Sequence, residues 1–256
     1  MISLPFIQTI SNQQQIDQST ILREYFQIIF LKYFYQHSHQ AYFKGGTAIR
    51  LLFNSFRYSE DLDFTCLDHA DYFKLISQII PQIETETTTG IKLTREKNVG
   101  EIGERFRLIF QPNEITKQPL GIKLDFSYRE KPIDPQTSIM TTTYPVTPPP
   151  LVKHYSQAEI LSEKIRAMFT RNKARDLFDL WFLLKQNTPI IWDYVVQKMK
   201  YYPQVEYDRT LLTKTIDQYN PDQFKLDLNQ FLPKNYRQLY PQIIRETVSL
   251  LNTSKF

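Results

Sequence analysis

Residues 43–64 read FKGGTAIRLLFNSFRYSEDLDF, and this stretch holds the densest group of chemically informative residues in the chain. Gly45 and Gly46 have no Cβ atom, so their backbone N–H groups can approach a phosphate closely. Residues 47–53 follow with a helical pattern that begins with Thr47, so the positive N-terminal end of that helix would face the same anion. The glycine pair, Thr47 and the helix together predict a phosphate-binding turn.

Asp61 and Asp63 lie at the end of this stretch and predict a metal site. On a strand, their alternation with Leu62 sends both carboxylates to one face. Two adjacent carboxylates repel each other unless a cation lies between them. Mg²⁺ is usually held by one or two carboxylates together with the phosphates of the substrate. The alternative interpretation is a glycine turn and an exposed Asp-x-Asp that have no common role.

A second predicted strand, residues 120–128, reads LGIKLDFSY and carries another candidate ligand. Lys123 and Asp125 share one face of this strand, and apolar residues occupy the other. If the strand pairs beside the one with Asp61 and Asp63, Asp125 becomes a third carboxylate at the metal site. The alternative is that Asp125 is exposed to solvent or pairs with a neighbour such as Lys123.

Periodicity along the chain predicts an α+β fold in two parts. The pattern predicts helices over residues 19–35 and 47–53, and a third with periodicity over residues 71–80 that ends around the Thr-rich run 84–89. It predicts strands over residues 41–44, 62–65, 104–111 and 120–128. The prolines at 148–150 predict a stiff connection, so we expect one domain over residues 1–150 and a second over residues 151–256. In the second domain a capping-box pattern at Ser156 opens a helix, and nearly all of the remaining chain is predicted to be helical.

Composition places the chain among globular proteins. Of its 256 residues 41% are apolar, which suits a real core. We expect a cytoplasmic protein, because the sequence shows no secretory signal, no apolar run long enough for a bilayer, and Cys66 as its lone cysteine. The net charge of +4 is uneven, since residues 151–256 hold 16 Lys and Arg against 11 Asp and Glu. A basic half suits a polyanionic substrate.

The Gly-Gly-Thr turn, the helix after it and residues 57–64, RYSEDLDF, resemble the AbiEii/AbiGii-toxin family of nucleotidyltransferases. Its members are generally the toxin halves of bacterial toxin–antitoxin or phage-defence systems and share the polymerase-β-like nucleotidyltransferase fold. The match extends over most of residues 40–185. It implies a catalytic domain with a small mixed sheet, followed by an all-helical domain that completes the nucleotide cleft. Arg57, the first residue of RYSEDLDF, either reaches a phosphate or pairs with Glu60.

Residues 163–179 read EKIRAMFTRNKARDLFD and form a second cluster of charged residues. On an unbroken helix, Lys164, Arg171 and Arg175 lie within a narrow arc of one face, and Asp179 lies close to it. Three cations on one face favour an anionic ligand, such as the phosphates of a nucleotide or an RNA backbone. Lysine would act there as a point charge and the arginines as planar forks.

The same cluster resembles the family's second signature, a Glu-Lys followed by an Arg-Asp-x-x-Asp helix. The resemblance implies that Lys164 contacts the nucleotide phosphates, and that Asp176 and Asp179 hold the basic side chains or contribute to the site. Two alternatives stay open. Arg175 and Asp179 could form a simple surface pair, or Asn172 could break the helix so that the basic stripe is not continuous.

Together these inferences define one predicted site. Asp61, Asp63 and Asp125 would bind one or two Mg²⁺ ions, and Asp125 would also accept the proton of the attacking hydroxyl. Lys164 completes the predicted catalytic residues. The predicted nucleotide-binding residues are Gly45, Gly46, Thr47, Arg57, Lys164, Arg171, Arg175, Asp176 and Asp179.

The predicted activity is Mg²⁺-dependent transfer of a nucleotide from an NTP to an RNA or protein acceptor by a toxin-like enzyme. Within the family, tRNA 3′ ends are one kind of acceptor, and a cognate antitoxin partner is implied by the resemblance alone. The alternatives are transfer to a small molecule, phosphoryl transfer to a protein, and a catalytically idle NTP- or RNA-binding module. Four tyrosines among basic residues give a weaker indication of RNA stacking: Tyr201, Tyr202, Tyr236 and Tyr240.

Overall fold

The computed structural model describes residues 2–98, 102–112, 116 and 118–253. The chain forms two compact units. The first comprises Met1–Asn54 and Tyr58–His154, and the second comprises Ser55–Arg57 and Tyr155–Phe256. Within the described residues, no helix is long and apolar enough to cross a membrane.

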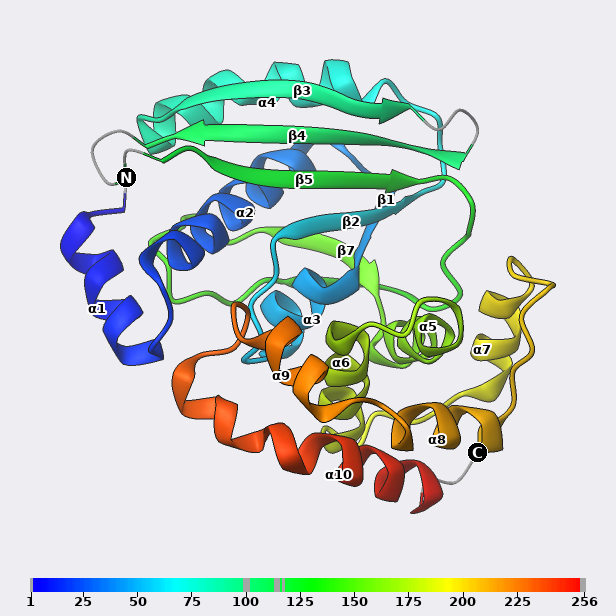
Figure 1. The fold of residues 1–256 in the computed structure, drawn as a ribbon. Coiled ribbons are helices and arrows are strands. Elements are labelled where there is room, and N and C mark those ends of the chain that lie inside the picture. The colour runs from blue at the N-terminus through cyan, green and yellow to red at the C-terminus, as the bar shows by residue number, and fades with distance from the viewer. Residues whose placement is uncertain (1, 99–101, 113–115, 117, 254–256) are drawn as a thin grey trace. The chain divides into compact units, whose positions relative to one another are not determined.

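The first unit is built on a seven-stranded mixed sheet with the strand order β3-β4-β5-β2-β1-β7-β6 (Figure 1). Its strands are β1 (Ala41–Lys44), β2 (Asp61–Cys66), β3 (Gly90–Asn98), β4 (Gly103–Gln111), β5 (Leu120–Ser127), β6 (Pro135–Ile139) and β7 (Leu151–Tyr155). Strand β2 pairs antiparallel with β1 and parallel with β5. Strand β7 pairs parallel with β1, with Phe43 opposite His154. The mixed sheet confirms the predicted fold class.

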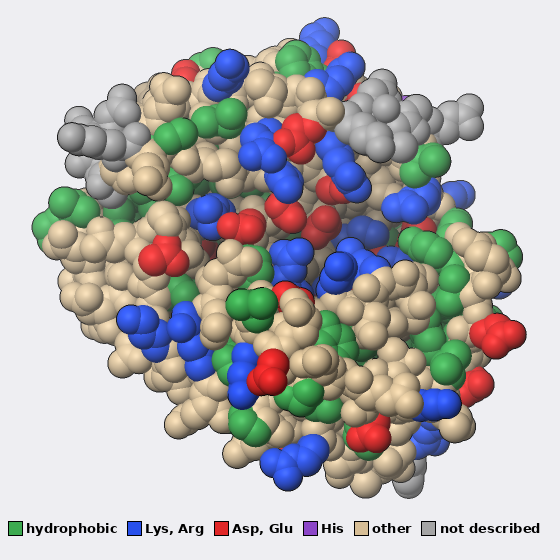
Figure 2. Space-filling model, in the orientation of Figure 1, with side chains coloured by type: hydrophobic (Ala, Val, Ile, Leu, Met, Phe, Trp, Pro, Cys, Tyr) green, Lys and Arg blue, Asp and Glu red, His purple; other side chains and the backbone are tan. Residues whose placement is uncertain are grey.

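The helices of this unit are α1 (Leu4–Gln14), α2 (Gln18–His37), α3 (Gly45–Phe53) and α4 (Tyr72–Thr87). Helices α2 and α4 cover one face of the sheet. Phe26 of α2 stacks on Phe110 of β4 with ring centroids 4.2 Å apart, and Tyr72 of α4 stacks on Phe126 of β5 at 4.5 Å. Because side chains alternate along a strand, Arg105 and Arg107 of β4 and Lys123 and Asp125 of β5 lie on the opposite face. Figure 2 shows acidic and basic side chains mingled over β3, β4 and β5.

The second unit is helical, as predicted. Its helices are α5 (Gln157–Thr170), α6 (Ala174–Lys185), α7 (Trp192–Met199), α8 (Arg209–Asp217), α9 (Pro221–Leu228), the 3₁₀ helix η2 (Lys234–Leu239) and α10 (Tyr240–Thr253). Ser156 caps α5 by accepting a hydrogen bond of 3.1 Å from the Glu159 N–H, as the capping-box pattern predicts.

Helices α2 and α3 are longer than expected, and α4 ends within the Thr-rich run, as predicted. Helix α2 covers Gln18–His37, and helix α3 begins at Gly45, two residues before the predicted start, because the glycines form part of its first turn. Helix α4 continues to Thr87, although Pro81 lies inside it and removes one backbone donor. Ile83 and Thr87 are buried beyond the proline, and their burial offsets the lost hydrogen bond.

Candidate active site

Gly45 joins β1 to α3 and lies against a carboxylate. Its φ of +76° is in the left-handed region that favours glycine, and a Cβ atom at this position would come within 2.2 Å of Asp63 Oδ2. The approach follows from the sheet register, since Lys44 pairs with Asp63 across the antiparallel strands β1 and β2. The predicted glycine turn and the predicted metal ligand Asp63 are therefore in direct contact.

Thr47 has a positioning role in this turn. Its side chain is fully buried, and its hydroxyl donates a hydrogen bond to the carbonyl oxygen of Asp61. This bond joins the first turn of α3 to the start of β2, which fixes the glycines relative to the carboxylate strand. The hydroxyl proton points to the backbone, so a nucleotide contact by Thr47 stays a prediction.

Strand pairing brings predicted metal ligands from β2 and β5 to neighbouring positions of the sheet. Asp61 and Asp63 are half-buried on β2, with Leu62 buried on the opposite face. The parallel pairing of β2 with β5 sets Asp63 opposite Asp125 and Asp61 opposite Lys123. The pairing that the sequence analysis stated as a condition is therefore present, and Asp125 is half-buried on the same face as Asp63.

Arg105 lies beside these carboxylates and was not predicted from the sequence. Its Nε donates to Asp125 Oδ2 at 2.6 Å, so Asp125 pairs with Arg105 and not with Lys123. The hydrogen bond from Arg105 to Asp125 raises the pKa of the guanidinium, and the nearby charge of Asp63 adds to this. The sequence did contain a signal for Arg105, because the alternation in its strand places it on the face opposite the buried Phe106. With β4 antiparallel to β5, Arg105 then lies opposite Asp125.

The donor set suits a divalent cation, although it is not gathered around one point. Among the described residues, no three His, Cys, Asp or Glu side chains lie together in a group that could hold a metal ion as they stand. Three half-buried carboxylates on one face are nevertheless the hard oxygen ligands that Mg²⁺ prefers. The absence of a Cβ on Gly45 lets the Asp63 carboxylate lie directly against the backbone of the glycine turn. Metal binding by Asp61, Asp63 and Asp125 stays a prediction that fits this chemistry.

Arg57 lies in a buried ion pair of the second unit. Its Nε and its terminal nitrogen Nη2 lie 2.7 Å and 2.8 Å from the two oxygens of Asp179, and both side chains are almost fully buried. Such a bidentate pair fixes both partners in orientation as well as in distance. Glu60, the other partner considered from the sequence, pairs with Arg23 at 2.9 Å.

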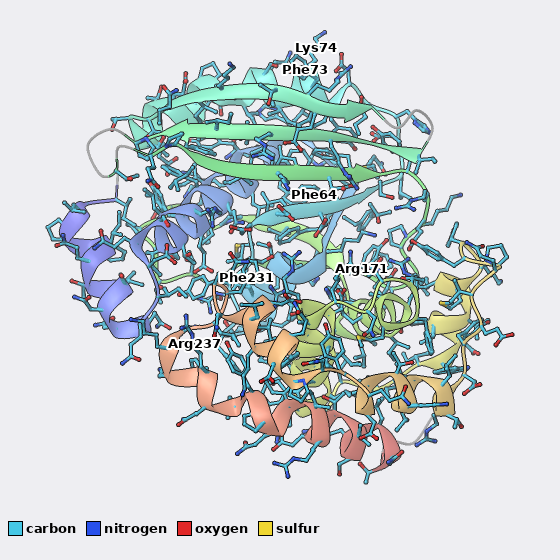
Figure 3. The ribbon with its side chains drawn as sticks, in the orientation of Figure 1. Phe64, Phe73, Lys74, Arg171, Phe231 and Arg237 are labelled. Atoms are coloured by element: carbon cyan, nitrogen blue, oxygen red, sulfur yellow. The ribbon has the colours of Figure 1, made fainter. Side chains whose placement is uncertain are left out.

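Lys164 and Arg171 complete this network. Lys164 Nζ lies 3.0 Å from Asp176 Oδ1 and 2.8 Å from Asp179 Oδ2. Arg171 binds both oxygens of Asp176, each at 2.7 Å. Lys164 is buried, whereas the Arg171 side chain is 60% exposed. The network therefore reaches the surface through Arg171, which lies where α5 ends (Figure 3).

Burial and ion pairing act in opposite directions on these groups. Burial alone would raise the pKa values of Asp176 and Asp179, but Lys164 with Arg171 or Arg57 lowers both. Burial alone would lower the pKa of Lys164, but Asp179 and Asp176 raise it. Lys164, Asp176 and Asp179 therefore stay charged at neutral pH, and the guanidinium groups of Arg57 and Arg171 face the two carboxylates.

The continuous basic stripe expected from residues 163–179 is wrong. Asn172 has a φ of +45°, so α5 ends at Thr170 and α6 begins at Ala174, as the second alternative proposed. Arg175 lies apart from the network, with its guanidinium 5.0 Å from the centre of the Phe231 ring. The alternative of a simple Arg175–Asp179 surface pair is wrong as well, because Asp179 is buried against Arg57 and Lys164.

The tyrosines considered for RNA stacking are largely occupied within the second unit. Tyr236 stacks on Phe56 with ring centroids 4.1 Å apart, and Tyr240 is buried. The Tyr202 ring lies 5.3 Å from the Arg166 guanidinium. Tyr201 is 47% exposed.

A mixed sheet that brings carboxylates against a glycine-initiated helix, together with a helical unit, defines the nucleotidyltransferase class. The chain belongs to the family described as nucleotidyl transferase AbiEii toxin, type IV TA system, which matches residues 29–255. The resemblance seen in the sequence motifs is therefore confirmed, and the protein is a nucleotidyltransferase of this toxin family.

Solved structures share the fold. The nucleotidyltransferase toxin MenT4 from Mycobacterium tuberculosis H37Rv is 15% identical with a TM-score of 0.65, covering 100% of this chain and 91% of its own. A putative nucleotidyltransferase from Helicobacter pylori is 21% identical with a TM-score of 0.61, covering 93% and 95%. JHP933 from Helicobacter pylori is 20% identical with a TM-score of 0.60, covering 93% and 92%. Comparison with curated proteins gave no match.

Proposed function

We propose that the protein is a Mg²⁺-dependent toxin that transfers a nucleoside monophosphate from an NTP to a hydroxyl of an RNA acceptor. One observation carries this proposal: Asp63 stands opposite Asp125 in the β2–β5 register and directly against the backbone of Gly45. Carboxylates for a divalent ion and backbone N–H groups for phosphates are thus side by side, as transfer from an NTP requires. The basic excess of residues 151–256, 16 against 11, supports a polyanionic acceptor.

The roles of the first unit follow from charge and position. Asp61, Asp63 and Asp125 would hold the ion, and bound Mg²⁺ would neutralise charge on the triphosphate. Asp125 would also accept the proton of the attacking hydroxyl. The hydroxyl oxygen bonds to the α-phosphorus, the bond from that phosphorus to the bridging oxygen breaks, and pyrophosphate leaves. Gly45 and Gly46 would bind phosphate oxygens through their N–H groups.

The second unit would contribute positive charge. Arg171 is the most exposed of the three cations in the network, so it suits direct contact with a phosphate. Lys164, predicted as a catalytic cation, would act with it by keeping Asp176 and Asp179 charged and fixed. Arg57 would have the same structural role, because it fixes the orientation of Asp179.

A cognate antitoxin and a cytoplasmic site of action belong to the same proposal. The family is described as part of type IV TA systems. NTPs and RNA are both cytoplasmic, so a toxin that consumes them would act there.

The test is incubation of the purified protein with Mg²⁺, total bacterial RNA and each α-³²P-labelled NTP in turn. Label should enter RNA with the wild-type protein and fall at least about a hundredfold with Asp63→Asn. Asparagine keeps the size of the side chain and removes its charge, so repulsion from Asp125 falls and the fold is retained. Glu96→Gln removes a carboxylate from β3 of the same sheet and should leave the incorporation of label unchanged.

Each other outcome has a definite meaning. Label in protein or in a small molecule, with the same dependence on Asp63, would keep the transferase and replace the acceptor. Full activity of Asp63→Asn would rule out the metal site. Binding of NTP without label in any fraction would instead favour an NTP- or RNA-binding module.

A further inference from the structure

Arg105 stands beside the carboxylates of the first unit on the same face of the sheet. Its Nε lies 2.6 Å from Asp125 Oδ2, and its side chain is 52% exposed. In the sheet, β4 sets Arg105 opposite Asp125, and β2 sets Asp63 on the other side of Asp125. The three side chains therefore follow one another across three neighbouring strands.

Arg105 and a divalent cation make competing demands on Asp125. A carboxylate oxygen that accepts a charge-assisted hydrogen bond from a guanidinium has less negative charge to offer a metal. The guanidinium also repels any other cation nearby. A bare divalent cation must therefore displace Arg105 from Asp125 or bind against its charge.

For a metal–nucleotide complex, the charge of Arg105 has the opposite effect on binding. The triphosphate outweighs the charge of the metal, so the complex as a whole is an anion. An arginine at the edge of the site attracts this anion, and its planar fork can transfer from Asp125 to a phosphate oxygen. The same side chain thus disfavours the bare ion and favours the ion that arrives with a nucleotide.

We propose that Arg105 is a positioning residue that makes the carboxylate site select metal–nucleotide complexes over bare metal ions by competing for Asp125. The inference rests on the proposed function, because it takes Asp125 to be a metal ligand. Arg105 acts through Asp125, and its effect is on binding before any transfer takes place.

Calorimetric titration of the full chain tests this in two arms. One arm uses Mn²⁺ alone, and the other uses Mn²⁺ bound to an NTP analogue with a methylene group between the α- and β-phosphates. Arg105→Met should bind bare Mn²⁺ about three- to tenfold more tightly and the complex more weakly by a similar factor. Arg105→Lys, which keeps the charge, should retain most of the wild-type selectivity.

Arg107 provides a matched control. It lies two residues along β4 on the same face, is 38% exposed and pairs with Glu96. Arg107→Met should leave both affinities within about twofold of the wild type. Thermal unfolding of each variant checks that the fold is intact.

Variants of Asp125 distinguish a failure of this inference from a failure of the proposed function on which it rests. In the Arg105→Met background, Asp125→Asn should abolish the gain in Mn²⁺ affinity. Mn²⁺ binding that depends on Asp125 but is unchanged or weaker in Arg105→Met would overturn the inference and leave the metal site standing. Mn²⁺ binding by the wild type that does not depend on Asp125 would overturn both.

Discussion

At the scale of single residues, Gly45 is a position where the backbone leaves little choice. Its left-handed φ disfavours every residue with a Cβ, and the space a Cβ would need is taken by the Asp63 carboxylate. The two constraints are independent, because one is local to the chain and the other comes from strand pairing. A glycine is therefore required both for the turn and for the position of the carboxylate.

Gly45→Ala should destabilise the protein by about 1–3 kcal/mol and displace Asp63, so that activity falls more than stability alone explains. Gly90→Ala is the matched control, since a Cβ there would come no closer than 4.0 Å to Gln111 and its φ is not in the strained region. Urea denaturation and the labelling assay measure the two effects. Activity of Gly45→Ala equal to that of Gly90→Ala would contradict the proposed contact.

At the scale of elements, the two strands that carry the carboxylates and their neighbours β1 and β4 were predictable, whereas β3, β6 and β7 were not predicted. Strand β1 matches its predicted range, and β2 and β5 differ from theirs by a residue or two at the ends. Alternation of apolar and polar residues is a local property, so it identifies a strand and the side of the strand on which Asp63 and Asp125 lie. That Asp63 and Asp125 are neighbours could be stated only as a condition, because the order of strands in a sheet depends on contacts between distant parts of the chain.

The partners of the charged residues were not predictable for the same reason. Arg57 and Asp179 are 122 positions apart, and Arg105 and Asp125 are 20 apart on antiparallel strands. Only the folded arrangement brings such pairs together. The helix break at Asn172 was one of two local possibilities, and asparagine is among the residues that enter the left-handed region most easily. It lets Arg171 turn back to Asp176.

Acidification should weaken this network between α5 and α6. Asp176 and Asp179 have pKa values below the 3.8 of an unperturbed aspartate, so they bind protons more weakly in the folded protein than in the unfolded chain. Their stabilising contribution is present above that pH and is lost as the pH falls through the lower folded-state values. Asp176→Asn should cost about 3 kcal/mol at neutral pH, and its difference from the wild type should shrink below about pH 4.

Urea denaturation followed by tryptophan fluorescence measures this effect. The exposed Asp222 is the control, because its side chain is 94% accessible. Asp222→Asn should stay close to the wild type at every pH. A difference between Asp176→Asn and the wild type that does not change with pH would contradict the ionised network.

At the scale of the whole molecule, a short segment belongs to one unit by sequence and to the other by packing. Ser55–Arg57 lies between α3 and β2, yet it is part of the second unit. Phe56 stacks on Tyr236 and makes an edge contact with Phe178 at 5.2 Å. Arg57 forms the buried pair with Asp179. The core of the helical unit is therefore incomplete without residues from the other half of the chain.

Residues 155–256 expressed alone should consequently be less stable, by at least about 3 kcal/mol, than the same unit in the full chain. The fragment lacks the Phe56 ring and leaves both oxygens of the buried Asp179 without Arg57, so that Oδ2 keeps its contact with Lys164 and Oδ1 loses its arginine donor. Both tryptophans, Trp181 and Trp192, lie in this unit, so their fluorescence follows its unfolding in either protein. Phe56→Ala with Arg57→Met in the full chain should lower the tryptophan transition toward that of the fragment, because the covalent chain is then intact and only these contacts are lost. Equal urea midpoints for fragment and full chain would show instead that the helices form a complete core without this segment.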